Sequence, residues 1–479
     1  MKLSKSKDHN PNYLATICKI GEVHPIEGAD RLVRTVINGY DIIISKEMAA
    51  ASNEPVVYFP CETAIAHKYL SANNLYAIEC YNLNSNAEEV QKVIETDKDK
   101  AKSMVGFFSK QRRVRILKLR GEYSQGFLAG TDTLRCMMKN PNEQVDWNAL
   151  VGEQFDEIDG ELLCEKYIPA VKQSNQHGSQ HQYNRCMKKL NRFDRIIPEE
   201  FKFHFDTTML AEHIKEISPE AIVNISVKVH GTSTIHGNVL VNRRLKWYEK
   251  IKKFFGFNVP TTEYGNVYSS RTVIKNRYIN NNVTPGFYGV DIWGCVNRDF
   301  ADALAPGMTV YGEIVGYLEG SQTMIQKNHD YGCKPGQWKF MPYRIVTKQS
   351  DGTVKEWTVD EVWEWTANLK YTYSLDPDRK QLAEKLMLIN ILYHGKFCDL
   401  YPDIPIDEHW HENVLARLKC DFEMEKQEPM CRLKAPREGI VIRIDNDKFP
   451  RAWKLKSKAH YSLEAKQHDT GDADIEETA

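Results

Sequence analysis

The chain has 479 residues, of which 42% are hydrophobic and 27% are charged, and its formal net charge is -1. This length allows roughly two to four domains, and the apolar content is sufficient for buried cores. No apolar stretch reaches the length of a membrane-spanning helix, and "MKLSKSKDHN" leads into no signal-peptide core. The 11 cysteines are scattered without a C-x-x-C pair, which predicts free thiols in the cytoplasm or another reducing intracellular compartment.

Residues 1–165 are expected to form a small β-barrel. The strand-like runs "YLATICKI", "RLVRTVINGYDIIIS" and "EPVVYFP" alternate with turn residues, and "RRVRILKLRGEYSQGFL" returns to a strand pattern. Several short strands in succession favour an OB-like barrel. A charged insertion near 81–107 is expected to be a helix or a mobile segment. In "RRVRILKLR" one face is expected to enter the core while the other meets phosphates, unless its arginines only solubilise an edge.

The rest of the chain is expected to hold a linker, a second domain and a tail. Residues 166–198 are polar and basic, which is typical of a linker, and the acidic residues 466–479 predict a disordered tail. The mixed domain between them, residues 199–465, carries an insertion near 355–430. Within it, "RRLKWYEKIKKFFGF" predicts a basic amphipathic helix, and "RKQLAEKLMLINILYHG" predicts a longer helix that ends at Gly395.

The stretch "NISVKVHGTSTIHGNVL" predicts a strand, a bend at Val229–Gly231, and the returning strand of a hairpin. Lys228 would then lie at the mouth of the hairpin, where a lysine can simply extend its stem along the surface. Four further stretches also set one or two polar residues in an apolar strand: "VYSSRTVIKNRY", "TVYGEIVGYLEG", "KFMPYRIV" and the pair "REGIVIRI" and "RAWKLKSKAHY". Such a series is typical of a β-lined pocket with a few convergent polar groups.

These stretches resemble the motifs of the covalent nucleotidyltransferases, the superfamily of polynucleotide ligases and mRNA capping enzymes. Lys228-Val-His-Gly-Thr-Ser233 resembles the K-x-[DH]-G motif of the nucleophilic lysine, and its histidine is the form common in RNA ligases. Glu438-Gly-Ile-Val-Ile-Arg443 and Lys454-Leu-Lys456 resemble the last two motifs. The N-terminal part is similar to that of ATP-dependent RNA ligases with an OB domain ahead of the catalytic domain. The resemblance implies an α+β fold, with an N-terminal OB-like β-barrel followed by a mixed α/β nucleotidyltransferase domain built on antiparallel sheets.

The resemblance implies that Lys228 attacks the α-phosphate of ATP to form a lysyl-adenylate. An unperturbed lysine has a pKa of about 10.4, so neighbouring cations or a metal are expected to lower it. Lys454 and Lys456 alternate on one strand and would contact the same phosphate, unless they are merely solvated. A carboxylate beside a triphosphate requires a divalent cation, so Glu438 is predicted to bind Mg²⁺ or Mn²⁺. The alternative is an ordinary surface glutamate.

The remaining nucleotide contacts come from the same resemblance. Glu313 would bond the ribose hydroxyls. Tyr343 would stack on adenine, although Phe340 is a rival and Tyr343 could be a core residue. Arg271 would reach a phosphate, or else form a structural ion pair.

The motif around the lysine also supplies His230, Gly231 and Ser233. His230 would hydrogen-bond nearby or serve the later steps, unless its role is structural. Gly231 permits a close backbone approach, and Ser233 would touch the nucleotide or the nick. Many RNA ligases carry a glutamate that reads adenine just before the nucleophile, but this chain has Val227, so base recognition is expected from backbone atoms.

The sequence therefore predicts an ATP-dependent RNA ligase that seals 3′-OH and 5′-phosphate ends through lysyl-adenylate and adenylated-RNA intermediates. The expected partner is a nicked duplex with an RNA 3′-OH strand, in RNA repair. One alternative is a GTP-using capping guanylyltransferase, but only 23 residues follow Lys456 in the 479-residue chain, too few for the C-terminal OB domain usual there. Another is a non-catalytic nucleic-acid-binding protein with a degenerate pocket, which the presence of Lys228, Glu438, Lys454 and Lys456 disfavours.

Overall fold

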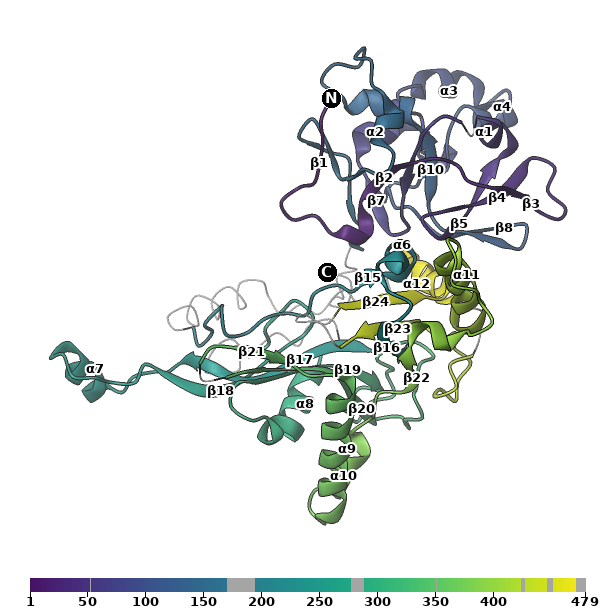
Figure 1. Ribbon diagram of the computed structural model, residues 1–479. Helices are drawn as coiled ribbons and strands as arrows, with labels where there is room; N and C mark the ends of the chain where they lie inside the picture. Colours follow the sequence, from purple (N-terminus) through teal and green to yellow (C-terminus); the bar gives the residue numbers. More distant parts are fainter. Residues whose placement is uncertain are drawn as a thin grey trace. The chain divides into compact units, whose positions relative to one another are not determined.

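The computed structural model describes residues 1–51, 53–169, 194–276, 288–349, 351–423, 427–445 and 451–470 (Figure 1). They form two compact units. Unit 1 comprises Met1–Ile168 with Ala211–Ile214, and unit 2 comprises the other described residues. Both combine helices with largely antiparallel sheets, so the predicted α+β class is confirmed. Among the described helices, none combines the length and the apolar character that a membrane crossing requires.

Unit 1 is built from short strands that pair antiparallel in small sheets, with the orders β10-β6-β2-β11, β3-β4-β5, β1-β12-β13, β14-β7 and β8-β9. The strands are β1 (Leu3–Ser4), β2 (Ala15–Cys18), β3 (Val23–Pro25), β4 (Leu32–Ile37), β5 (Tyr40–Ser45), β6 (Val56–Phe59), β7 (Thr63–Ile65), β8 (Leu117–Leu119), β9 (Glu122–Ser124), β10 (Phe127–Gly130), β11 (Gln154–Phe155), β12 (Glu157–Ile158), β13 (Glu161–Leu162) and β14 (Cys164–Lys166). The α-helices are α1 (Lys46–Ala50), α2 (His67–Ala72), α3 (Ala87–Val93), α4 (Lys98–Ser103) and α6 (Leu210–His213). The strands expected from "YLATICKI", "RLVRTVINGYDIIIS" and "EPVVYFP" are confirmed as β2, β4 with β5, and β6.

One expectation for unit 1 is confirmed and another needs correction. The charged insertion near 81–107 forms the helices α3 and α4, and its Val90 and Ala101 are fully buried, so it belongs to the packed unit. In "RRVRILKLR" only the end of the run forms a strand, β8. Arg113 is 3% exposed and its guanidinium lies 3.8 Å from Glu62 and over the Tyr167 ring, so this arginine faces the interior and not solvent.

Unit 2 is built on two five-stranded sheets with the orders β15-β24-β23-β16-β22 and β18-β17-β19-β20-β21. All pairs are antiparallel except β15 with β24. The strands are β15 (Thr208–Met209), β16 (Ile222–Lys228), β17 (Thr232–Asn242), β18 (Thr262–Ser269), β19 (Met308–Gly316), β20 (Trp338–Lys348), β21 (Val354–Glu356), β22 (Ile391–Lys396), β23 (Gly439–Ile444) and β24 (Arg451–Lys456). The helices are α7 (Trp247–Phe254), α8 (Ile292–Phe300), α9 (Val359–Leu375), α10 (Lys380–Lys385), α11 (Trp410–Leu418) and α12 (Lys458–Thr470). The helices α8 and α9 lie beside the second sheet (Figure 1). Their apolar residues share one hydrophobic core with those of β19 and β20.

The hairpin predicted around Lys228 is wrong. β16 and β17 belong to different sheets, and Val229–Gly231 carry the chain from one sheet to the other. The reason is that both edges of β16 are already paired, one with β22 and the other with β23. The following strand therefore has no free edge to fold back upon, and it pairs with β18 and β19 instead.

Two boundaries also differ from expectation. The long helix expected to end at Gly395 is wrong: α10 stops at Lys385, and Ile391–Lys396 forms β22, because pairing with β16 outweighs the helical spacing of its apolar residues. Of the tail predicted at 466–479, residues 466–470 belong to α12, where Gln467 and His468 are buried, and residues 471–479 lie outside the described residues. Most of the expected linker, residues 170–193, lies outside the described residues. The amphipathic helix expected in "RRLKWYEKIKKFFGF" is confirmed as α7.

Candidate active site

Strand register brings Lys228, Glu438 and Lys456 to one end of the first sheet of unit 2. Lys228 is opposite Gly439 in the β16–β23 ladder, and Gly439 is opposite Lys456 in the β23–β24 ladder. Lys228 Nζ lies 2.7 Å from Glu438 Oε1, and Lys456 Nζ lies 3.8 Å from the same oxygen. Lys456 Nζ also lies 3.0 Å from Glu464 Oε2 on α12, so two carboxylates hold it. Three motif residues predicted from separate stretches therefore meet at one point.

The charges at this point are strongly coupled because they are buried. Burial lowers the pKa of Lys228, but the Glu438 carboxylate outweighs that effect and the net pKa is raised. Burial likewise raises the pKa of Glu438, yet the adjacent Lys228 ammonium brings it well below its usual range. The two groups form an ammonium–carboxylate pair. The nearest charge to Lys228 is here a carboxylate and not a cation, so the lowering of its pKa by a metal or other cations stays a prediction.

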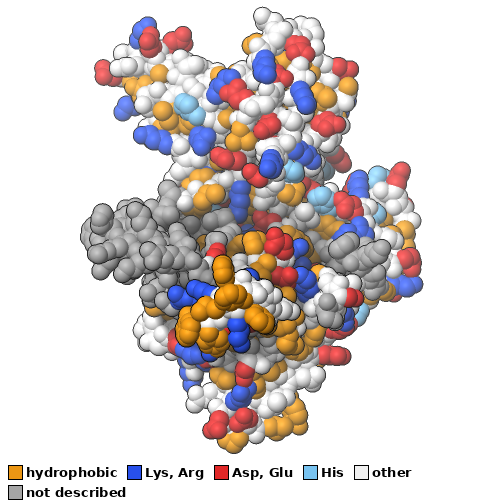
Figure 2. Space-filling view, turned by 90° about the vertical axis from the view of Figure 1, so that its left-hand side faces the viewer, with side chains coloured by type: hydrophobic (Ala, Val, Ile, Leu, Met, Phe, Trp, Pro, Cys, Tyr) orange, Lys and Arg blue, Asp and Glu red, His pale blue; other side chains and the backbone are white. Residues whose placement is uncertain are grey.

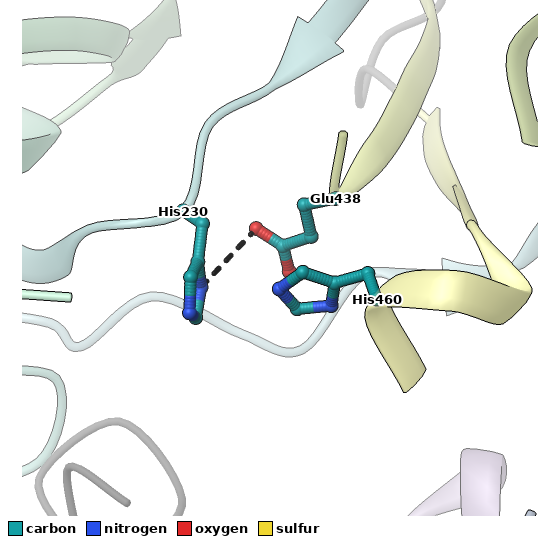
Figure 3. Close-up of side chains that lie close together, drawn as sticks. All are labelled: His230, Glu438 and His460. Carbon is teal, nitrogen blue, oxygen red and sulfur yellow. Dashed lines mark ion pairs between the residues drawn. The ribbon is translucent and has the colours of Figure 1, made fainter. Parts of the chain in front are cut away.

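Two imidazoles lie beside the Glu438 carboxylate (Figure 3). His230 Nδ1 is 3.7 Å from Glu438 Oε2, and the His230 and His460 ring centroids are 4.5 Å apart at an interplanar angle of 83°. One donor atom from each of the three residues lies within 4.8 Å of the others, so these residues could hold a metal ion. Burial lowers the pKa of His460 to about 4 and also lowers that of His230, so both rings are neutral at neutral pH.

The turn after Lys228 is sterically constrained. A Cβ at Gly231 would lie 2.3 Å from the Ile314 carbonyl oxygen and 2.8 Å from the Glu313 side chain, both on β19. Only glycine therefore fits at this position next to β19. Ser233 is directly opposite Glu313 in the β17–β19 ladder, and both side chains are buried. The Glu313 carboxylate also acts to raise the pKa of Lys228. Gly231, Ser233 and Glu313 thus belong to the neighbourhood of the lysine.

The two candidate stacking residues differ in environment. Phe340 is 2% exposed and its ring contacts His236 and Phe300 in the hydrophobic core, so it cannot reach a ligand without repacking that core. Tyr343 is only partly buried, and its ring centroid lies 5.5 Å from that of His204. Of the two rings, Tyr343 is the less buried one, although it also packs against two hydrophobic cores.

The remaining predicted residues are also located. Lys454 lies on β24 and is buried opposite Val441. Arg271 follows β18 and forms an ion pair with Asp206, as the structural alternative expected. Its guanidinium is therefore held by a carboxylate in this arrangement.

Sequence reasoning missed several residues near the site. His460 and Glu464 lie on α12, four and eight residues after Lys456, but this stretch was expected to lead directly into a tail. The segment 200–206 was not singled out either. Within it, burial lowers the pKa of His204, and the charges of Arg344, Arg271, Lys454 and Lys228 lower it further, which puts this histidine close to the basic residues of the site. The alternation of aromatic residues in "FKFHFD" was the available signal.

Comparison with known proteins adds evidence on the fold. No family model and no curated protein matches the sequence. The chain is similar to solved structures of a Naegleria gruberi RNA ligase. A variant with ATP and Mn is 16% identical, with a TM-score of 0.51 over 94% of this chain and 98% of that chain. A second variant, with AMP and Mn, has a TM-score of 0.52 at 16% identity over the same shares, and the ligase with PPi has 0.50 at 17%, again over 94% and 98%. The chain therefore has a fold similar to that of an RNA ligase along nearly its whole length.

Proposed function

We propose that the protein is an ATP-dependent RNA ligase that joins 3′-OH and 5′-phosphate ends. The observation that carries the proposal is the contact of Lys228 Nζ with Glu438 Oε1 at 2.7 Å, with Lys456 beside the same oxygen. A buried lysine at a strand end, paired with a buried carboxylate and flanked by a second lysine, suits nucleotidyl transfer. The similarity in fold to an RNA ligase solved with ATP and Mn supports this assignment.

In the first step, Lys228 Nζ bonds to the α-phosphorus of ATP while the bond to the pyrophosphate oxygen breaks. The amine must lose its proton first, and the Glu438 contact opposes that loss. Glu438 would hold a Mg²⁺ or Mn²⁺ ion, whose charge would offset this carboxylate and polarise the phosphate. Lys454 and Lys456 stabilise the charge that develops on the phosphate oxygens.

The other candidate residues bind the nucleotide. Glu313 bonds the ribose hydroxyls, and Tyr343 stacks on adenine. Arg271, which pairs with Asp206 in this structure, would leave that carboxylate and contact a phosphate of ATP, because the triphosphate carries more negative charge. His230, Gly231 and Ser233 shape the turn beside the α-phosphate, where Gly231 allows close approach of the backbone.

In the later steps AMP passes to the 5′-phosphate of RNA, and the 3′-OH displaces it to form the phosphodiester bond. We assign the catalytic role to residues 199–465 and RNA holding to residues 1–165, as an OB-like domain. Within "RRVRILKLR", Lys118 and Arg120 are exposed and suit phosphate contact, whereas Arg113 does not. The substrate would be a nicked duplex with an RNA 3′-OH strand, and the role RNA repair.

A sealing assay with two kinds of nick tests the proposal. The wild-type protein should seal a 5′-phosphate nick with ATP and a divalent cation, but not with GTP. Lys228→Ala should fail on that nick yet seal one whose 5′-phosphate already carries AMP, because the lysine is needed only for the first step. Sealing with GTP alone would support a guanylyltransferase-like specificity, and no sealing of either nick would refute the ligase assignment.

A further inference from the structure

The side chains of His230, Glu438 and His460 converge from three separate segments (Figure 3). His460 is 1% exposed, and neither of its ring nitrogens has a hydrogen-bond partner among the residues that the structure describes. His230 Nε2 and Glu438 Oε2 are likewise buried without one. Buried polar atoms are nearly always hydrogen-bonded, because leaving them unpaired is costly. These three adjacent side chains thus carry four buried polar atoms without a hydrogen-bond partner, which indicates a missing ligand that takes one atom from each residue.

A third imidazole, that of His329, shows that a buried histidine in this neighbourhood can have hydrogen-bond partners for its ring nitrogens. The His329 ring centroid lies 4.8 Å from that of His230, and His329 is fully buried. Its Nδ1 lies 2.9 Å from the Lys327 carbonyl oxygen and its Nε2 lies 3.1 Å from the Pro436 carbonyl oxygen. Both of its nitrogens are thus occupied, whereas those of His460 point to no protein acceptor.

We propose that His230, Glu438 and His460 directly bind one divalent transition-metal ion, of the Zn²⁺, Co²⁺ or Mn²⁺ class. Two neutral imidazoles and a carboxylate suit such ions, whereas Mg²⁺ prefers oxygen ligands and keeps its water. Ligand atoms about 2.1 Å from a metal lie roughly 3 to 3.5 Å apart. The His230 Nδ1–Glu438 Oε2 distance of 3.7 Å is close to that, and the widest separation, 4.8 Å at most, needs only small ring movements.

The site couples the metal to the nucleophile through one carboxylate. Glu438 Oε2 faces the His230 imidazole while Oε1 contacts Lys228 Nζ at 2.7 Å. A cation on Oε2 weakens the attraction of Oε1 for the lysine ammonium. The inference deepens the proposed function, because it names the ligands and the kind of metal at the nucleophilic lysine. Metal binding itself requires neither ATP nor RNA.

The test is a titration of the full-length, metal-free protein with Co²⁺, followed by visible absorption, without nucleotide. One Co²⁺ should bind per chain, Zn²⁺ should displace it, and a hundredfold excess of Mg²⁺ should not. His230→Gln and His460→Gln should each weaken binding at least tenfold. The matched variant His329→Gln removes a neighbouring buried imidazole and should change the affinity less than threefold, with thermal unfolding curves confirming that all variants fold.

Lys228→Ala separates this inference from the proposed function, because it should bind Co²⁺ but form no AMP adduct. Unchanged Co²⁺ affinity in both His variants, or displacement by Mg²⁺ as effective as by Zn²⁺, would overturn the metal site even if the wild-type protein seals RNA. Conversely, histidine-dependent Co²⁺ binding in a protein that never forms an AMP adduct would leave the site standing and refute the ligase function.

A second, independent feature is α7, which lies on the connection between β17 and β18 and projects from the rest of unit 2 (Figures 1 and 2). None of its residues is buried. Trp247 is 74% and Phe254 85% exposed, and Ile251, Phe255 and Phe257 are exposed as well. Such a contiguous apolar surface on a folded protein marks a binding site.

Polar contacts hold α7 in place. The Arg243 guanidinium donates to both Glu249 carboxylate oxygens, at 2.8 and 3.2 Å, and to the Pro260 carbonyl oxygen at 2.7 Å. The Lys246 backbone N–H donates to Glu249 Oε2 at 2.8 Å. The helix therefore keeps its position without burying its apolar face, which stays available to a partner.

The charge of this segment indicates the partner's chemistry. Residues 243–257 carry six basic side chains and one acidic side chain, a net charge of +5, in a chain whose net charge is -1. We infer that α7 inserts its apolar face into an anionic lipid bilayer while its lysines contact the headgroups. An RNA strand would also pair with the lysines, but it would leave the aliphatic Ile251 exposed to water. A bilayer accommodates both surfaces.

Vesicle co-sedimentation of the full-length protein tests this inference. Binding to phosphatidylcholine vesicles with phosphatidylserine should exceed binding to phosphatidylcholine alone at least tenfold and fall with added salt. The double variant Phe254→Ser/Phe255→Ser should lose this binding, and so should Lys252→Glu/Lys253→Glu. As a control, Lys355→Glu alters an exposed lysine elsewhere and should bind normally. The inference would be overturned if the protein bound neither kind of vesicle, or if both double variants bound vesicles as well as the wild type. It would also be overturned if the double variants lost affinity for RNA but kept their affinity for vesicles.

Discussion

Lys228 Nζ and Glu438 Oε1 lie 2.7 Å apart at the end of two paired strands. The contact joins the proposed nucleophile to the proposed metal ligand, and each group determines the charge of the other. The carboxylate keeps the lysine protonated, and the ammonium keeps the carboxylate ionised far below its usual pKa. In the proposed mechanism, a cation bound to the carboxylate would therefore lower the pKa of the lysine and so trigger the reactivity of its amine.

Glu438→Gln tests that trigger. The amide keeps the shape of the side chain but loses the charge that holds the metal, so adenylation should fall by about a hundredfold or more. Extra Mn²⁺ should restore only part of the rate, because the ligand itself is weakened. Rates of AMP labelling over a metal titration provide the measurement. A variant that labels like the wild type at low metal would show that Glu438 is no metal ligand.

The lysines of β24 give a second prediction. Lys454→Ala and Lys456→Ala should each slow transfer of AMP to Lys228, since each removes a positive charge next to the α-phosphate. Lys456→Ala should also slow the sealing of a pre-adenylated nick. Lys466→Ala, at an exposed position on α12, is the control and should have no effect. Single-turnover rates of labelling and of sealing provide the measurement, and normal rates in both β24 variants would mean that neither lysine contacts the transferred phosphate.

Gly231→Ala should damage the site through sterics alone. The added Cβ would meet the Ile314 carbonyl oxygen at 2.3 Å, so β17 and β19 must separate. We expect a loss of about 1–3 kcal/mol in the free energy of unfolding, together with slower adenylation. Gly130→Ala is the matched control, because nothing lies within 4 Å of its Cβ position. Urea unfolding of both variants makes the comparison, and equal stabilities would contradict the close approach at Gly231.

Tyr343→Ala and Phe340→Ala should affect different properties. Tyr343→Ala should weaken ATP binding by about 1–3 kcal/mol, since a base-stacking surface is lost. Phe340→Ala should instead lower the free energy of unfolding by about 3–5 kcal/mol, because it leaves a cavity in the core. Isothermal titration with ATP and urea unfolding separate the two effects. The reverse pattern would make Phe340 the stacking residue.

Much of the site could be predicted because its residues lie in strands whose apolar alternation is visible in the sequence. Lys228, Glu438 and Lys456 each end or precede such a strand, and antiparallel register then brings them together. His460 and Glu464 could not be found in this way. They lie on a helix that contributes only a few side chains to the site, and its polar composition resembles that of a tail.

The errors in the fold have a common physical cause. The path of the chain after Lys228 depends on both edges of β16 being paired, and one of those edges is taken by β22, a strand more than 150 residues later. The helical spacing of the apolar residues before β22 runs on into this strand, so only the pairing with β16 reveals it. Arg113 is a similar case, because its burial depends on Glu62 and Tyr167, which local periodicity cannot indicate.

The covalent AMP adduct on Lys228 is the most direct test of the central claim. The full-length protein is incubated with ATP and Mn²⁺, its intact mass is measured, and the modified peptide is sequenced by mass spectrometry. We predict a gain of one AMP, located on Lys228, and no gain in Lys228→Ala or in Lys228→Arg, whose guanidinium remains protonated. An adduct that persists in either variant, or a wild-type protein that gains no AMP, would contradict the account.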